Sequence, residues 1–172
     1  MITGFHHTSF TVTDVDQTER FFVDFLGMER VGGGRYDFGY IRKVVALPDA
    51  VLKIAVLAFP EKQGVRPPDR LELIEYARGA GSPCDTATNR PGNAHLCFVV
   101  DDIQVEHRRL TALGVKFKSL PQEITFGVNR GGWTAYFNGP DGVALELVQP
   151  AKNDGSETTR PRPVLSVSPK EA

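Results

Sequence analysis

The sequence HLCFVVDD at residues 95–102 decides the fold, because it has the same pattern as the sequence HTSFTVTD at residues 7–14. Each stretch begins with a histidine, continues as a run typical of a β-strand, and ends with an aspartate that can cap a following helix. Gly27 and Gly114 follow the two stretches at nearly equal spacing. The sequence therefore indicates an internal duplication in which each half starts with a strand and a helix.

The pattern predicts a helix after each of these strands. Thr13-Asp14 can cap the first helix, over residues 17–26, and Gly27 ends it. The second helix covers residues 103–113 and ends at Gly114. The residues expected on the buried faces are Phe21, Phe22, Phe25 and Leu26 in the first helix and Val105, Leu110 and Leu113 in the second.

Both halves close with a strand that carries the tripeptide Leu-Glu-Leu, at residues 71–73 and 145–147. In the first half, β-like runs predict strands over residues 36–46, 51–59 and 71–76. Each half then has the order β-α-β-β-β, and the fold class is α+β with two tandem βαβββ modules.

Composition changes set the expected boundaries. A first module is expected at residues 1–77 and a second at residues 92–150. Residues 78–91 are rich in small and polar residues and are predicted to be a linker. Residues 151–172 are predicted to form a disordered tail, because from residue 152 onward they have too few large apolar residues to offset the entropy of ordering.

Composition also excludes several classes of function. The chain of 172 residues has 20 Lys+Arg and 21 Asp+Glu, a net charge of −1, which argues against a nucleic-acid or membrane-surface partner. Cys84 and Cys97 are too few for a disulfide framework. The longest apolar segment, residues 50–59, has about half the length that a membrane span needs, and the start has no secretory signal pattern. A soluble, cytoplasmic protein is expected.

Two histidines and two glutamates occupy equivalent positions in the two modules. His7 and His95 open the first strands, and Glu72 and Glu146 lie in the closing strands. A lone strand histidine is more often structural than a ligand, but recurrence in register favours a metal site. Mixed nitrogen and oxygen donors suit a divalent Zn, Ni, Co, Mn or Fe ion.

Several of these motifs together resemble the vicinal oxygen chelate superfamily. They are the His-x6-Asp spacing, the helix ending Phe-Leu-Gly-Met at residues 25–28, both Leu-Glu-Leu tripeptides, residues 94–102, and the segment Gly-Pro-Asp-Gly-Val-Ala-Leu-Glu-Leu at residues 139–147. That superfamily includes glyoxalase I, methylmalonyl-CoA epimerase, extradiol dioxygenases and fosfomycin or bleomycin resistance proteins. The resemblance covers about residues 4 to 150 and implies a cupped, mostly antiparallel sheet with outer helices, around a divalent metal.

The resemblance also implies roles for individual residues. His7, His95 and Glu146 match metal ligands, and Glu72 matches the fourth ligand of the glyoxalase and epimerase branch. Glu75 is ranked second, because strand alternation points it away from Glu72. A complete set of four favours an isomerase or lyase that works through a metal-stabilised enediolate on a small oxygenated substrate. Glu146 is slightly favoured over Glu72 as the catalytic base.

Two alternative functions stay open. The first is an extradiol-type dioxygenase using Fe(II), for which Tyr136, Pro140, Gly142 and Glu146 fit the signature. The histidine that this signature requires falls on Asn129, and an amide cannot take the catechol proton. The second is a small-molecule binding or resistance protein of the same fold without catalysis.

Loops beside the expected cup supply candidates for substrate binding. Arg42, on a hairpin expected at residues 42–60, and Asn129 and Arg130, in the loop at residues 122–132, could hold an anionic or thioester substrate. Tyr136 could pack against a ligand or against the core. The resemblance further implies frequent homodimers, in which cups sit side by side or modules exchange.

Overall fold

The fold consists of two modules of the same order in a single chain, seen in a computed structural model that describes residues 1–2, 4–61 and 69–151. The first module contains β1 (Thr8–Val12), α1 (Val15–Arg20), a π-helical turn η1 (Phe21–Phe25), β2 (Glu29–Tyr36), α2 (Gly39–Val44), β3 (Val51–Ala58) and β4 (Leu71–Arg78). The second contains β5 (His95–Val99), α3 (Ile103–Ala112), β6 (Gln122–Glu123), β7 (Trp133–Asn138), a 3-10 turn η2 (Pro140–Gly142) and β8 (Ala144–Gln149).

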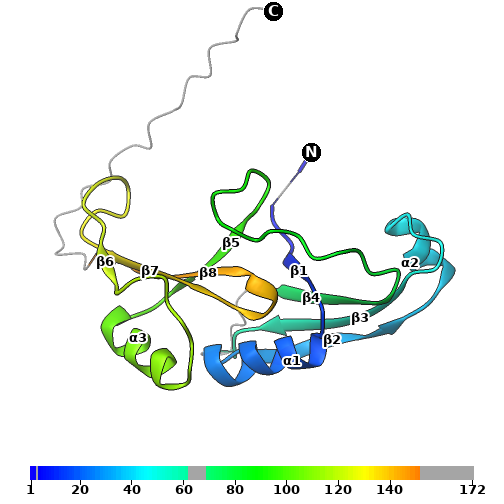
Figure 1. Cartoon of the computed structure of the whole chain (residues 1–172), viewed down its shortest axis with the longest axis horizontal. Helices are drawn as coiled ribbons and strands as arrows, with labels where there is room; N and C mark the ends of the chain where they lie inside the picture. The colour runs from blue at the N-terminus through cyan, green and yellow to red at the C-terminus, as the bar shows by residue number, and fades with distance from the viewer. Residues whose placement is uncertain (3, 62–68, 152–172) are drawn as a thin grey trace, which may run out of the picture.

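Each module builds its own four-stranded mixed sheet (Figure 1). The strand orders are β1-β4-β3-β2 and β5-β8-β7-β6, so the same topology occurs twice. The first strand of each module pairs in parallel with the last, and the other pairings are antiparallel. The predicted α+β class with two βαβββ modules is therefore confirmed.

Equivalent hydrogen bonds begin the long helix of each module. Asp14 and Asp102 are the N-caps, and their carboxylates accept hydrogen bonds from the backbone N–H groups of Gln17 and Val105. The last strand satisfies one more N–H group in each helix. Glu75 accepts from the N–H of Val15, and Gln149 accepts from the N–H of Ile103. These bonds fix each helix against one face of its sheet.

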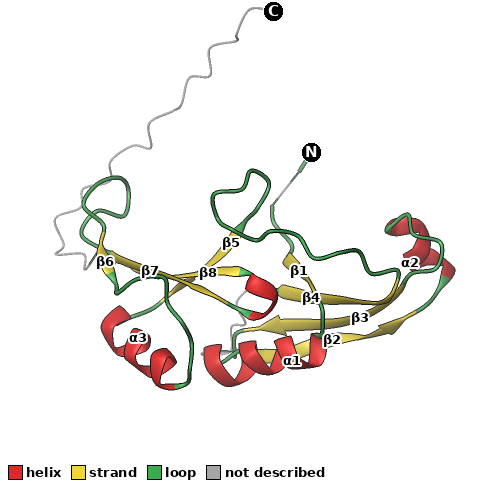
Figure 2. Cartoon of the chain, viewed as in Figure 1, coloured by secondary structure: helices red, strands yellow, loops and turns green. Residues whose placement is uncertain are grey.

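Strand alternation divides each sheet into a face that packs on the helices and an open face. Leu71, Leu73, Leu145 and Leu147 are almost completely buried in the core, together with Phe22 of the first helix. Figure 2 shows α1 and α3 in red below the strands of both sheets. Glu72 and Glu146 lie between the buried leucines, so their side chains belong to the open faces, away from these helices.

One predicted strand is wrong. Residues 36–46 do not form a strand: the strand is β2, which ends at Tyr36, and residues 39–44 form helix α2. The three glycines at residues 32–34 weaken the strand signal of β2. The fold requires Gly33, because the chain there has a φ of 106° beside a bulge and a Cβ atom would lie 2.1 Å from the carbonyl oxygen of Ile54.

The predicted helices are present, with two errors in the second buried face. Ile103 and Leu110 are fully buried, whereas Val105 and Leu113 are 50% and 46% exposed. The first helix confirms its apolar face, with Phe22 buried and Phe21, Phe25 and Leu26 packed against the core. Within the described residues, no helix is long and apolar enough to span a membrane. The predicted tail from residue 152 lies outside those residues.

Polar contacts and an aromatic contact join the modules. The Asp141 carboxylate in η2 accepts hydrogen bonds from the N–H group and the hydroxyl of Thr13, at 2.7 and 2.6 Å. Arg109 of α3 donates to the carbonyl oxygen of Phe25 at 2.5 Å. The ring of Phe22 lies 6.5 Å from that of Phe98, which belongs to β5. The helix side of the first module is therefore packed against the second.

We predict that Thr13→Val lowers the free energy of unfolding by about 1 kcal/mol, because it removes one hydrogen bond to a carboxylate and keeps the backbone one. Urea denaturation measures this loss. Thr111→Val, at an exposed position of α3, is the matched control and should change stability far less. Equal losses for both variants would contradict the role given to the contact between Thr13 and Asp141.

Candidate metal centre

The first predicted pair is His7 and Glu72. His7 directly precedes β1, and Glu72 is the second residue of β4, opposite Ser9 in the parallel register. The Nε2 atom of His7 lies 3.5 Å from Oε2 of Glu72, and both side chains are partly exposed. The Nδ1 atom of His7 lies 2.8 Å from Nδ1 of His6.

The second predicted pair is His95 and Glu146, and it has more neighbours. The Nε2 atom of His95 lies 3.0 Å from Oε2 of Glu146. The Thr134 hydroxyl donates a hydrogen bond of 2.5 Å to Oε1 of the same glutamate. The hydroxyl of Tyr136 lies 3.2 Å from Nε2 of His95. Strand β7 therefore supplies two hydroxyl groups around this pair.

Both pairs fit two adjacent ligands of one metal ion. Ligand atoms about 2.1 Å from a tetrahedral or octahedral ion lie about 3.0 to 3.4 Å apart when they are neighbours. The nitrogen to oxygen distance of 3.0 Å in the second pair lies within that range, and the 3.5 Å in the first pair lies just above it. A neutral imidazole with a carboxylate is also a suitable donor set for a divalent first-row ion.

The structure does not bring the four predicted ligands together. Each histidine contacts the glutamate of its own module. Among the residues that the structure describes, no group of three or more His, Cys, Asp or Glu side chains is placed to hold a metal ion. The chain therefore presents two half-sites, one on each sheet.

Glu75, the second-ranked carboxylate, has a structural role. Its Oε2 atom accepts the hydrogen bond from Val15, and its Oε1 atom lies 2.9 Å from Nζ of Lys53. The carboxylate raises the pKa of Lys53. Glu75 contacts the start of helix α1, on the side of β4 away from Glu72, and does not take part in the half-site of Glu72.

The predicted substrate-binding residues lie apart. Arg42 is in helix α2, not in a hairpin, and its Nε atom donates to the carbonyl oxygen of Ala50. Asn129 and Arg130 are exposed in the loop between β6 and β7. Figure 1 shows α2 at one end of the molecule and this loop at the other. Of this group, only Tyr136 lies beside a predicted ligand.

Sequence reasoning missed two residues of the second half-site. Thr134 contacts Glu146, and the ammonium group of Lys118 lies 6.0 Å from the centre of the Tyr136 ring. Thr134 and Tyr136 are two residues apart in β7 and share a face, a signal that alternation alone could have supplied. Lys118 belongs to the loop between α3 and β6. Its backbone N–H group donates a hydrogen bond to the carbonyl oxygen of Tyr136, which holds this loop beside β7.

Glu146 and partial desolvation keep two neighbouring groups protonated. Cys97 is opposite Glu146 in the register of β5 and β8. Partial desolvation, followed by the negative charge of Glu146, raises the pKa of the Cys97 thiol to about 12. Desolvation and a hydrogen bond to Glu146 likewise raise the pKa of Tyr136 to about 12. Both groups therefore carry their protons at neutral pH.

Sequence comparison identifies the superfamily to which the chain belongs. The profile of the Glyoxalase/Bleomycin resistance protein/Dioxygenase superfamily matches residues 4–147, and the chain belongs to this superfamily. A 2-epi-5-epi-valiolone epimerase from Actinomyces sp is 32% identical over 148 residues, which cover 83% of this chain and 77% of that protein.

Solved structures show the same fold. A glyoxalase family protein from Bacillus cereus has a TM-score of 0.71 and 21% identity, over 88% of this chain and 96% of that one. Glyoxalase I from Zea mays has a TM-score of 0.56 and 19% identity. That match covers 85% of this chain but 44% of the maize chain.

We predict that Cys97 reacts with iodoacetamide much more slowly than Cys84 although both are exposed, because the raised pKa of Cys97, about 12, leaves very little of its thiol ionised at pH 8. Mass spectrometry of the two peptides measures both rates. Glu146→Gln should speed the reaction of Cys97 and leave Cys84 unchanged, because it removes the negative charge beside Cys97. Equal rates at the two cysteines in the wild-type protein would contradict the prediction.

Proposed function

We propose that the protein is a metal-dependent epimerase or isomerase that moves a proton on the carbon beside a carbonyl group of a small oxygenated substrate. The observation that carries the proposal is the recurrence of a His–Glu pair at equivalent positions of the two modules, each spaced as two ligands of one ion. The 32% identical relative, named as an epimerase of a valiolone, supports this choice over other reactions of the superfamily.

His7, Glu72, His95 and Glu146 would hold the ion, with Zn, Ni, Co, Mn and Fe as the candidates. A bound divalent cation would stabilise the negative charge left on the carbonyl oxygen when the neighbouring carbon loses its proton. Glu72 and Glu146 are the two carboxylates that could carry this proton. They come from different modules, so one could remove the proton from one face of the substrate and the other could return it to the opposite face.

We further propose that two copies of the chain complete each metal centre. Strands β1 and β5 each end their sheet, and each has its histidine at its start or directly before it. If β1 of one copy lies beside β5 of the other, the strand order at the joint becomes β4-β1-β5-β8. Both histidine strands are then central, and both glutamate strands are next to them.

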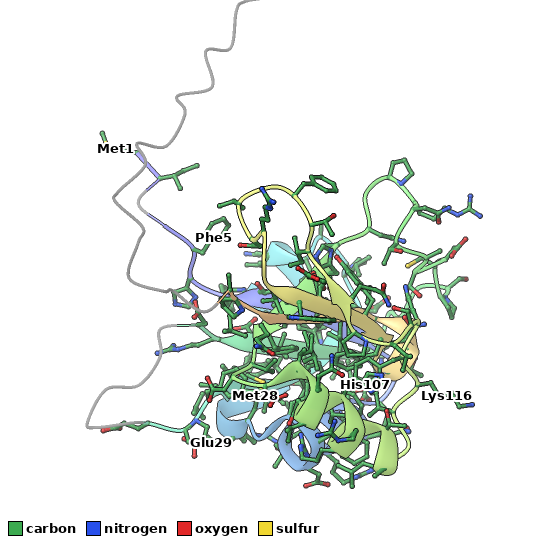
Figure 3. All side chains as sticks on the ribbon, turned by 90° about the vertical axis from the view of Figure 1, so that its left-hand side faces the viewer. Met1, Phe5, Met28, Glu29, His107 and Lys116 are labelled. Atoms are coloured by element: carbon green, nitrogen blue, oxygen red, sulfur yellow. The ribbon has the colours of Figure 1, made fainter. Side chains whose placement is uncertain are left out.

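Exposed apolar side chains near β1 and β5 support this pairing of two copies. Val99, on the open face of β5, is 71% exposed, although it is a large apolar residue in a strand. Described residues near the start of the chain are also uncovered: Met1 and Phe5 are fully exposed, and Figure 3 shows both outside the sheets. A second copy would cover apolar surface of this kind.

We predict that the protein binds about one Co(II) or Zn(II) ion per chain, and that His95→Ala weakens this binding by at least about tenfold, because it removes a nitrogen ligand. Equilibrium dialysis with elemental analysis measures the affinity. His107→Ala is the matched control, since His107 stacks on Phe117 and does not belong to either half-site. The absence of metal binding to the wild-type protein would overturn the proposal.

Turnover is tested by hydrogen exchange. The metal-loaded protein is incubated with 2-epi-5-epi-valiolone in D2O, and NMR follows deuterium at the carbon beside the carbonyl group. We expect exchange with the wild-type protein and a loss of at least about a hundredfold with Glu72→Gln and Glu146→Gln together, since both proton carriers are removed. Exchange that continues in this double variant would contradict the role of the glutamates.

Shared sites predict complementation between two defective variants. Glu72→Gln and His95→Ala chains each lack one half-site, and each variant alone should bind metal poorly. After mixing and exchange of subunits, about a quarter of all sites should be intact, because half of the dimers are mixed and each mixed dimer has one complete site. Recovery of tight Co(II) binding measures this. No recovery, although subunit exchange is shown by mass, would place each site within one chain.

A further inference from the structure

The two glutamates have unequal surroundings although their positions are equivalent. Both oxygens of Glu146 have partners, with Oε1 accepting the 2.5 Å hydrogen bond from Thr134 and Oε2 lying 3.0 Å from His95. Within the described ranges, His7 at 3.5 Å is the side chain that contacts the Glu72 carboxylate. Glu146 is also the less exposed of the two, at 14% against 24%.

Register explains why, among the described residues, a hydroxyl contact is present at Glu146 and not at Glu72. Thr134 lies opposite Val148, two residues after Glu146. The equivalent position in the first module is Ile54, which lies opposite Ile74, two residues after Glu72. A branched alkyl side chain replaces the hydroxyl there, so nothing at that position can hold the second oxygen of Glu72.

A second neighbour differs in the same direction. Tyr136 lies directly opposite Glu146 in β7, and its hydroxyl reaches the paired His95. The residue opposite Glu72 in β3 is Val56. On the β7 side, polar groups therefore contact the pair in the second module, whereas on the equivalent β3 side the alkyl groups of Val56 and Ile54 flank Glu72.

We propose that Thr134 is a positioning residue that fixes Glu146 as a permanent ligand, and that Glu72 is the glutamate that leaves the ion and carries the proton. This inference rests on the proposed function and narrows its two candidate proton carriers to one: Glu72 would remove and return the proton, and Glu146 would stay on the ion. A carboxylate held at both oxygens must break a hydrogen bond to move, whereas one with a free oxygen can rotate away without that cost.

Thr134→Val tests the positioning role, because valine has the shape of threonine without the hydroxyl. We expect the dissociation constant for Co(II) to rise about tenfold and the visible spectrum of the Co(II) protein to change, since a ligand loses its orientation. Thr134→Ser keeps the hydroxyl and should restore both. Thermal unfolding of the metal-free variants shows whether they are equally folded.

Ile54→Thr tests the mobile role of Glu72 by adding a hydroxyl group beside it, whereas Thr134→Val removes one beside Glu146. The new hydroxyl would lie beside Glu72 as Thr134 lies beside Glu146, so it should hold the second oxygen of Glu72. We expect Co(II) binding to be equal or tighter and deuterium exchange into 2-epi-5-epi-valiolone to slow about tenfold. Ile54→Val has the same size as the threonine variant and no hydroxyl, and should exchange at the wild-type rate.

The outcomes separate the two proposals. If the wild-type protein binds no Co(II), the proposed function is wrong, and the division of roles falls with it. If the wild-type protein binds Co(II) and Thr134→Val binds it with the same affinity and spectrum, only the positioning role is overturned. If Ile54→Thr and Ile54→Val exchange deuterium equally fast, only the mobile role of Glu72 is overturned.

Discussion

Parallel pairing between the first and the last strand of each module is the constraint on which the candidate site depends. In both modules, the residue opposite the glutamate lies two positions after the histidine: Ser9 opposite Glu72, and Cys97 opposite Glu146. Residues two apart in a strand share a face, so each histidine necessarily projects beside its glutamate. The buried leucines on both sides of each glutamate hold this register, because a shift by one residue would expose them and bury the carboxylate.

Duplication accounts for the symmetry of the molecule, and divergence accounts for its chemistry. The helix caps and the contacts from Glu75 and Gln149 are the same in both modules, because each module must satisfy the same helix start. The open faces differ, because they do not form the core and are free to change. Thr134 and Tyr136 in place of Ile54 and Val56 give one His–Glu pair two hydroxyl neighbours on the β7 side and leave alkyl groups at the equivalent β3 side of the other.

Much of the fold could be predicted because the signals are local and occur twice. The aspartate caps, the terminating glycines and the Leu-Glu-Leu alternation are each readable within a few residues. Strand β2 was missed because its run of glycines hides the strand signal, and the need for Gly33 arises only from the close approach of the Ile54 carbonyl oxygen in the next strand. Val105 and Leu113 were misplaced because helical periodicity cannot tell how wide the covered stripe is.

The sequence by itself determined the two modules, the position of the helix that follows the first strand of each module, and the glutamate in each closing strand that faces away from the core. These features follow from hydrophobic periodicity and capping chemistry, which act over short distances. Tertiary structure alone decided that Thr134 binds Glu146, that Arg42 binds the Ala50 carbonyl, and that the described chain keeps its two His–Glu pairs apart. Those outcomes depend on strand register and on how whole sheets pack, which no local pattern encodes.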